Sequence, residues 1–335
     1  MSQPFVRVTN AWQHFWFDPQ ETSTLAIFRI AFGLVAIGWT ATLGPNLSAF
    51  YGPDGIVPHQ LPDGPGAWGI LDIWHGWVAV VVLFVVTLTA AAALTVGMFS
   101  RFAAALVWIG IVSFEHRNSL VSNSGDGLVR NLAFFCMLAP SGESLSIDRL
   151  LKTRERFWEF PARAPWALRL IQLQISIGYL TAVWDKSGNA LWRAGTGVSY
   201  SLRIQDIHRF ATPSFVTHSV IVTELFTYGT LVTELSLAIL IWNKTLRPWI
   251  LPMGVLLHLS IDFWVLVGFF SYAMFCGYLA FTPPETASRS ILATRDRLRR
   301  IRGGRPVAGP ASGAPVQLAR PNYPASTPES RRPQE

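Results

Sequence analysis

Residues 172–195 read QLQISIGYLTAVWDKSGNALWRAG, an apolar helical segment that becomes polar near Lys186 and breaks at Gly188. Gln172, Tyr179 and Lys186 follow one another at intervals of seven, so a helix places them on one face with about 20° of drift per heptad. A polar stripe on an apolar helix is typical of a membrane segment that lines a cavity. The stretch therefore predicts a membrane helix with a site at its Lys186 end.

Composition points to the same class of protein. Half of the 335 residues are hydrophobic and 14% are charged, whereas a soluble globular protein carries about 25% charged residues. The apolar residues gather in runs long enough to cross a bilayer, which takes about 20 residues each. The sequence therefore predicts an all-α fold, a polytopic membrane helix bundle.

The formal net charge of +7 originates in residues 286–335, which hold ten arginines and three acidic residues. Because the remainder of the chain is neutral, this basicity does not indicate a nucleic-acid partner, and none is expected. A basic, Pro-rich segment is typical of a disordered tail that contacts anionic lipid. Cys136 and Cys276 fall inside apolar runs and show neither zinc spacing nor a disulfide framework, so no metal site is expected.

The chain divides into three predicted parts. Residues 1–22 mix aromatic and polar side chains, which predicts an interfacial N-terminal helix. Residues 23–285 form the predicted transmembrane domain, and residues 286–335 form the tail. Apolar runs predict about eight transmembrane helices, at 24–43, 77–96, 102–120, 128–140, 166–184, 216–242, 248–259 and 263–281.

The distribution of Lys and Arg predicts that both termini are cytoplasmic and that the chain lies in the plasma membrane. Basic residues gather in the connections between spans 2 and 3, 4 and 5, and 6 and 7, and in the tail. The connections between spans 1 and 2 and between spans 7 and 8 hold none. The loop between spans 5 and 6 is basic although this topology puts it outside, and function is one reason for such a loop.

Candidate site residues converge on the outer side in this topology. They are Asp126 and Arg130 near the start of span 4, Tyr179 and Lys186 near the end of span 5, and His258 near the end of span 7. Each has an ordinary alternative. Lys186 could complement a helix dipole and snorkel to the headgroups, or serve as a general base. His258 could be a helix-end histidine bonded to the backbone, and Asp126 could be a helix cap paired with Arg130.

Two more charges lie inside predicted spans. Arg29 either snorkels to the interface or faces the bundle, and Glu234, at mid-span, must be paired or protonated. Residue chemistry leaves three classes open: enzyme, transporter and structural membrane protein. In the non-enzymatic alternative, a transporter or accessory protein, Glu224 and Glu234 bind an ion or pair with Arg29.

Four segments together resemble the HTTM domain, the membrane domain shared with vitamin K-dependent gamma-carboxylases. YLTAVWDKSGNALWRAG at 179–195 is similar to the family signature. FRIAFGL at 28–34, SGDGLVRNLAFFCMLAPSG at 124–142 and HLSIDFWVLVGFFSYAMF at 258–275 match further segments in the family's order. The resemblance covers residues 24–284, nearly all of the predicted membrane part.

The resemblance implies a chemistry for the site. In the carboxylases the lysine that closes the Tyr-containing helix is taken to deprotonate vitamin K hydroquinone, which oxygen converts to an epoxide while CO2 is added to a glutamate. Lys186 matches that base, His258 matches an active-site histidine, and Glu234 matches the acidic residue of span 6. The implied protein is bacterial, with a menaquinol-like cofactor, and its partners are the lipid bilayer and an exported peptide.

Two departures from the carboxylases limit what the resemblance implies. Residues 122–127, SNSGDG, hold no histidine where the carboxylases carry one, and no large lumenal portion follows the last predicted span. We therefore expect a quinol-dependent or peptide-modifying membrane enzyme with an outward-facing site, without propeptide-directed protein carboxylation. The expected catalytic residues are Lys186 and His258, and the expected pocket residues are Tyr179, Asp126, Arg130, Trp192 and Glu234.

Overall fold

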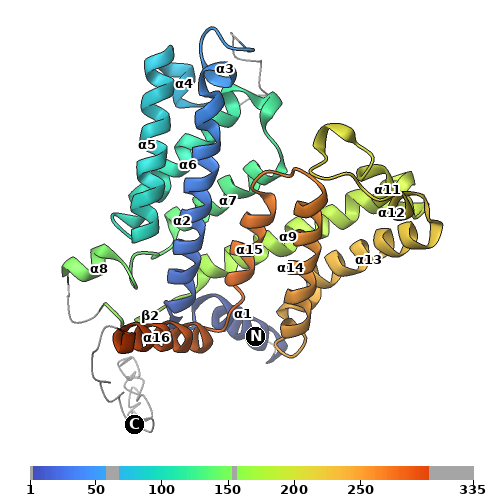
Figure 1. Ribbon diagram of the computed structural model, residues 1–335. Coiled ribbons are helices and arrows are strands. Elements are labelled where there is room, and N and C mark those ends of the chain that lie inside the picture. Colours follow the sequence, from blue (N-terminus) through green and yellow to red (C-terminus); the bar gives the residue numbers. More distant parts are fainter. Residues whose placement is uncertain (1–2, 58–67, 153–156, 302–335) are drawn as a thin grey trace, which may run out of the picture. The chain divides into compact units, whose positions relative to one another are not determined.

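The computed structural model describes residues 3–57, 68–152 and 157–301, and these are mainly helical (Figure 1). The chain divides into two compact units, residues 1–291 and residues 292–335, and the fold and site described below belong to the first. Two short strands, β1 (Gln20–Glu21) and β2 (Ala162–Arg163), pair antiparallel. The all-α prediction missed them because two residues are too few for an alternating pattern. Most of the predicted tail, from residue 302, lies outside the described residues.

A helix lies in each of the eight predicted spans, and at 263–281 it fills only part of the span. These helices are α2 (Ser23–Leu43), α5 (Trp77–Val96), α6 (Ser100–Arg117), α7 (Ser124–Leu138), α9 (Trp166–Gly188), α13 (Val220–Ile239), α14 (Arg247–Trp264) and α15 (Phe270–Leu279). The predicted N-terminal helix is α1 (Gln3–Phe17), and α16 spans Pro284–Ile301. Connecting helices and turns are η1 (Gly44–Asn46), α3 (Leu47–Tyr51), α4 (Ile70–Ile73), η2 (Ser119–Val121), α8 (Ile147–Lys152), α10 (Ala190–Arg193), α11 (Gly197–Ser201), η4 (Gln205–Ile207), α12 (Ser214–His218) and η5 (Leu240–Trp242).

Three helical stretches within the described residues are long and apolar enough to cross a membrane, Ser23–Tyr51, Trp77–Val96 and Val220–Trp242. Helix α15 has 10 residues, which extend about 15 Å against a hydrocarbon core of about 30 Å. The prediction of one continuous helix over 263–281 is therefore wrong. Helix α14 continues to Trp264, and the chain then turns through Gly268, whose φ of 59° glycine adopts readily.

Helices α2, α5, α6 and α7 pack in chain order, each against the next (Figure 1). Glycines allow this close approach. A Cβ at Gly33 would lie 2.8 Å from the Cα of Thr95, and one at Gly110 would lie 2.0 Å from the Oγ1 of Thr87. Small residues at helix contacts let backbones approach, as is usual in membrane bundles.

The side chain of Arg29 is completely buried in this bundle. Its Nη1 donates to the carbonyl oxygens of Ser141 at 2.8 Å and Ser144 at 3.1 Å, and its Nη2 donates to that of Leu145 at 2.7 Å. The snorkelling alternative is therefore wrong, and the arginine faces the bundle. Helix α2 is held in this way to the loop that follows α7.

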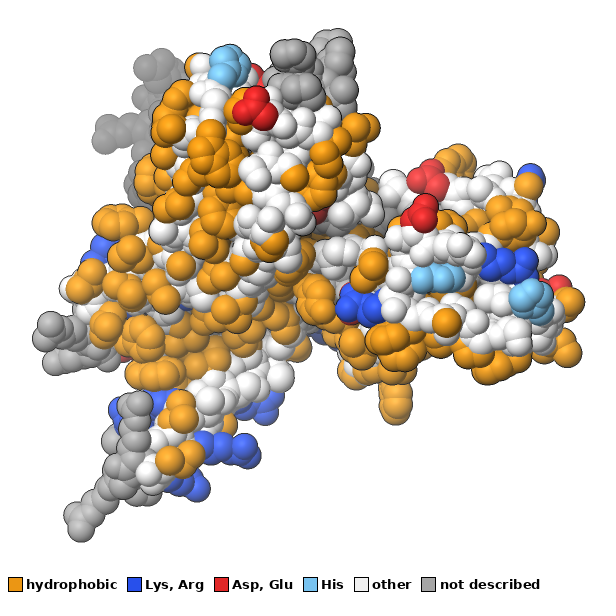
Figure 2. Space-filling view, turned by 45° about the horizontal axis from the view of Figure 1, so that its top comes forward, with side chains coloured by type: hydrophobic (Ala, Val, Ile, Leu, Met, Phe, Trp, Pro, Cys, Tyr) orange, Lys and Arg blue, Asp and Glu red, His pale blue; other side chains and the backbone are white. Residues whose placement is uncertain are grey.

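Large apolar side chains are exposed along several helices. On α5, Val78 is 66% exposed, and on α13, Ile221 is 79% and Leu225 is 66% exposed. Figure 2 shows hydrophobic side chains over much of the visible face. Contiguous exposed apolar surface of this extent is rare on soluble proteins and is expected where helices face lipid. The chain is therefore a helical membrane protein.

Helix α9, the segment with the polar stripe, packs against α7, α13 and α15. Its N-terminal part also holds α1, since Arg169 donates from Nε to the Phe15 carbonyl at 3.2 Å and lies 4.8 Å from the centre of the Phe15 ring. Helix α13 packs in turn on α14. These contacts bring the C-terminal half of α9 beside α13, α14 and α15, where a cavity opens.

Candidate functional site

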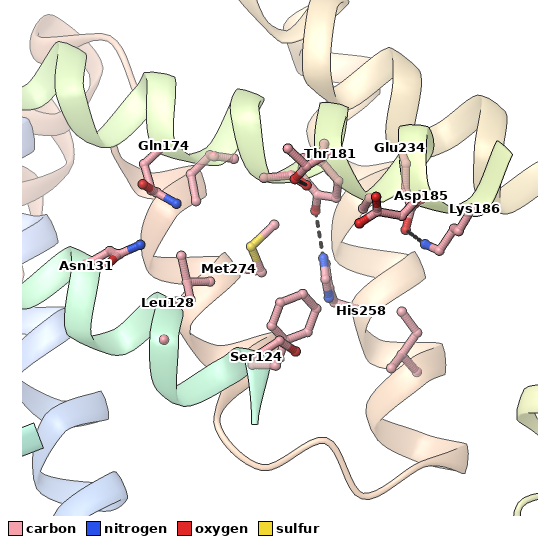
Figure 3. Close-up of a pocket in the computed structure, with 17 residues that line it drawn as sticks. Ser124, Leu128, Asn131, Gln174, Thr181, Asp185, Lys186, Glu234, His258 and Met274 are labelled. Atoms are coloured by element: carbon pink, nitrogen blue, oxygen red, sulfur yellow. Dashed lines mark hydrogen bonds and ion pairs between the residues drawn. The ribbon is translucent and has the colours of Figure 1, made fainter. Parts of the chain in front are cut away.

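A cavity of about 410 Å³ is lined by α7, α9, α13, α14 and α15 (Figure 3). Helix α9 lines it with a single face from Gln174 to Lys186, and α7 lines it with Ser124, Leu128 and Asn131. The spacing of these α7 residues, three to four positions, is that of one helical face. Small-molecule sites have volumes of about 300–1,000 Å³, so the cavity is large enough for a ligand.

Lys186 and Glu234 form an ion pair at one end of the cavity. Nζ of Lys186 donates to Oε1 of Glu234, which joins α9 to α13. The side chain of Glu234 is 6% exposed and that of Lys186 is 24% exposed. Within the described residues, Oε2 of Glu234 has no hydrogen-bond partner. A buried carboxylate requires a counter-charge, and Lys186 supplies it.

Trp192 returns over Lys186 after the chain breaks at Gly188. Asn189 caps the next short helix by accepting a hydrogen bond from the backbone N–H of Leu191 at 2.9 Å. This turn puts the Trp192 ring 4.9 Å from Nζ of Lys186, a cation–π distance. A Cβ at Gly197 would lie 2.6 Å from the same ring, so only glycine fits beneath it. Trp192 thus holds the lysine and does not itself line the cavity.

Tyr179 and His258 meet at the middle of the cavity wall. The Tyr179 hydroxyl bonds Nε2 of His258 at 2.6 Å and also bonds the hydroxyl of Tyr278. His258 is 1% exposed and packs edge-on against Phe270, with ring centres 5.3 Å apart. Its Nδ1 has no partner among the residues that the structure describes. The alternative of a helix-end histidine bonded to the backbone is therefore wrong for the ring, which bonds Tyr179 instead.

Asp126 and Arg130 do not line the cavity. Oδ1 of Asp126 accepts from Nε1 of Trp39 at 2.7 Å, and Oδ2 accepts from the backbone N–H of Asn123 at 2.7 Å. Nη1 of Arg130 donates to Oε2 of Glu115 at 2.5 Å. The periodicity of α7 turns positions 126 and 130 away from the cavity-lining face. Asn123 is the N-cap of α7, and Asp126 completes its capping box as the third helical residue, so Asp126 stabilises the helix start without being the cap itself. Within the described residues, Asp126 and Arg130 form no ion pair with each other.

The other predicted polar residues have structural partners. Nε2 of Gln172 donates to the carbonyl of Ala280 at 2.7 Å, and its Oε1 accepts from Arg169 at 2.9 Å. Glu224 is exposed. Because Glu234 pairs with Lys186 and Arg29 bonds carbonyl groups, the pairing of Arg29 with either glutamate is wrong. No group of three or more His, Cys, Asp or Glu side chains able to hold a metal occurs in the described part of the chain.

Sequence reasoning missed three polar residues of this region, Tyr278, Asn131 and Gln174. Tyr278 reaches Tyr179 across 99 positions of sequence, which no local pattern reveals. Gln174 had a usable signal, because it is a polar residue in an apolar helix on the face that carries Tyr179. Asn131 had the weaker signal of an amide early in a predicted span.

Comparison with known proteins gives one match. A family model described as the HTTM domain matches residues 17–285, most of the chain. No curated protein and no solved structure matches the chain. The family resemblance expected from the four sequence segments is therefore confirmed at the level of the domain.

Proposed function

The chain belongs to the HTTM domain family, and on that basis we propose that it is a membrane enzyme that takes a proton from a lipid-soluble substrate. The observation that carries the proposal is the ion pair of Lys186 and Glu234 on the wall of a cavity that also holds Tyr179 and His258. Base, acid and hydrogen-bonding groups thus converge on one space, as proton-transfer chemistry requires.

Lys186 would act as the base after it gives a proton to its partner, Glu234. Transfer of a proton from Nζ to Oε1 of Glu234 leaves a neutral amine and a neutral acid, and the amine lone pair then accepts a proton from the substrate. A low-dielectric surrounding favours such neutral forms over separated charges. Trp192 keeps Nζ in place, and Tyr179 fixes the ring of His258 so that its free Nδ1 can bond the substrate.

The cavity fits the quinol that the family resemblance implies. Most of its middle is apolar, with Leu128, Ile175, Phe270 and Met274 in the lining, which suits an aromatic ring. Oε2 of Glu234 and Nδ1 of His258 are buried without partners among the described residues, so they are free to bond its hydroxyl groups. A bound vitamin K hydroquinone or menaquinol would supply the acidic hydroxyl and the oxidisable ring for carboxylase-like or peptide-modifying chemistry.

The same proposal includes a topology. We place the chain in the plasma membrane of a bacterium with eight crossings, both termini cytoplasmic and the cavity open to the outer side, where an exported peptide would reach it. The clustering of Lys and Arg in the connections assigned to the inside supports this orientation. The chain segments that contain α7 and α15 count as crossings although these helices are short, because irregular backbone at membrane depth is tolerated where it lines a cavity.

The test compares wild-type protein with Lys186→Ala by native mass spectrometry and lipid extraction. Lys244→Ala is the matched control, because Lys244 is an exposed lysine outside the cavity. We expect a quinone-like molecule to co-purify with the wild type and the control but not with Lys186→Ala. Absence of a quinone from all three samples would overturn the quinol assignment. Full activity of Lys186→Arg and Lys186→Ala, with normal folding, would overturn the role of Lys186 as the base.

A proton-coupled transporter is the second candidate, favoured by the free oxygen of the buried Glu234 carboxylate. Proteoliposomes with an internal pH dye distinguish the two candidates. A transporter admits protons under an imposed gradient and loses this flux in Glu234→Gln, whereas the enzyme shows no flux in either form.

A further inference from the structure

Asn131 and Gln174 form a polar end of the cavity remote from Lys186. Asn131 comes from α7 and Gln174 from α9, and Figure 3 shows the two side-chain amides directed toward each other beside the cavity. Both residues are half-buried, and within the described residues neither amide forms a hydrogen bond to the protein. An amide both donates and accepts hydrogen bonds, so this pair is free to bond a ligand in the cavity.

Gln172, on the same helix, shows what a structural glutamine looks like here. Its amide nitrogen donates to Ala280 and its amide oxygen accepts from Arg169. Gln174 lies two positions later, on the face that lines the cavity. The side-chain amide of Gln172 is therefore hydrogen-bonded to the protein, whereas Gln174 lines the cavity.

The two polar ends are far apart. Gln174 and Lys186 are 12 positions apart on α9, which corresponds to roughly 18 Å at about 1.5 Å per residue. Between them the lining is largely apolar, with Ile175 and Met274 among its members, and its polar side chains include Tyr179 and His258, which bond each other. The cavity is therefore a passage along α9 with a polar group at each end.

We propose that Asn131 and Gln174 form a second binding subsite for a neutral, oxygen-bearing group at the end of the ligand remote from Lys186. An amide both donates and accepts hydrogen bonds, so the pair suits a hydroxyl, a carbonyl or an ester. An ionic group is excluded, because the charged lining residues Asp185, Lys186 and Glu234 lie at the other end. The ligand is thus an elongated, mainly apolar molecule with a polar group at each end. Only the identification of its reacting end rests on the proposed function.

The experiment compares two probes that differ in one group, straight-chain dodecanediol with a hydroxyl at each end and dodecanol with a hydroxyl at one end. Binding is measured by native mass spectrometry on the full chain in nanodiscs. The extra hydroxyl reaches the amide pair only if the cavity has two polar ends. We expect the diol to bind wild-type protein about 3- to 10-fold more tightly than dodecanol, the gain of one or two neutral hydrogen bonds.

Asn131→Leu and Gln174→Leu remove the amides at nearly unchanged volume, and both should abolish the preference for the diol. Because neither amide bonds the protein, both variants should keep wild-type thermal stability. Gln172→Leu is the matched control, which should lose stability through its lost bond to Ala280 yet keep the preference. Equal binding of the two probes to wild-type protein, or an unchanged preference in Asn131→Leu and Gln174→Leu, overturns the proposal.

Failure of this proposal is separable from failure of the proposed function. If the diol preference is absent but a quinone is lost in Lys186→Ala, the second subsite is wrong and the Lys186 chemistry stands. If the preference is present and disappears with the amides while no quinone is found, the subsite stands and the quinol assignment fails.

Discussion

Replacing Lys186 with methionine should destabilise the protein more than replacing Glu234 with glutamine. Lys186→Met leaves a carboxylate that is 6% exposed without a counter-charge, whereas Glu234→Gln leaves an ammonium that is 24% exposed and keeps its contact with the Trp192 ring. Loss of one partner from a buried ion pair costs about 3–5 kcal/mol. We expect a loss of about 3 kcal/mol in the free energy of unfolding for Lys186→Met, and about 1–2 kcal/mol for Glu234→Gln because water reaches its ammonium.

The double variant Lys186→Met/Glu234→Gln removes both charges and should be more stable than Lys186→Met alone. We expect a coupling energy of about 1–3 kcal/mol between the two positions, as for directly contacting residues. The coupling energy is obtained from a double-mutant cycle. Wild-type protein, the two single variants and the double variant are unfolded with denaturant in detergent micelles, and unfolding is followed by circular dichroism. Lys244→Met, at an exposed lysine, should change stability by no more than about 0.5 kcal/mol. Additive costs would refute the ion pair, and a larger loss in Glu234→Gln than in Lys186→Met would refute the burial argument.

Three further outcomes are expected. Gly178→Leu should fold normally, because no atom lies within 4 Å of a Cβ at this position, yet it should lose bound ligand in native mass spectra because the new side chain fills the cavity. Gly229→Leu is the control, because position 229 is equally open but lies outside the cavity, and it should retain the ligand. Retention of the ligand by both variants would contradict the placement of the ligand in this cavity. Gly33→Ala should lower the free energy of unfolding by about 1–3 kcal/mol, because its Cβ would meet the backbone of Thr95. The melting temperature should fall accordingly, and an unchanged melting temperature would count against the contact between α2 and α5. Arg29→Met should lower the free energy of unfolding by about 3 kcal/mol or more, because three carbonyl groups lose a charged hydrogen-bond donor. A near-neutral effect in denaturant unfolding would contradict this and indicate that water bonds these carbonyl groups in place of the guanidinium.

The parts of the fold that follow from local chemistry were predictable. Helix α9 ends at Gly188 as its sequence indicates, and Asn189 supplies the next cap. Helices occupy the predicted apolar runs because a bilayer admits few other structures. The interruption after Trp264 was missed because the run stays apolar through residues 265–270 and the turn depends on the conformation of Gly268.

The site was only partly predictable, for a physical reason. Lys186, Glu234, Tyr179 and His258 stand out because ionisable or polar groups are costly in apolar helices unless they have a function or a partner. Which groups pair with them depends on tertiary contacts, and Glu234 lies 48 positions from Lys186. Asp126 was misplaced because its place on a helix face relative to the cavity depends on how α7 packs.

The contacts of Arg29 have a consequence for how the chain is made. Its hydrogen-bond acceptors lie 112 to 116 positions later in the sequence. At translation rates of about 5–20 residues per second, roughly 6 to 23 seconds pass between synthesis of the arginine and synthesis of those carbonyl groups. During that interval the guanidinium of the first apolar helix has to stay at the lipid–water boundary or in a water-filled insertion channel. Arg29 therefore reaches its final partners only after residues 141–145 have been made, and this segment sets the earliest time at which the contact between α2 and the loop after α7 can form.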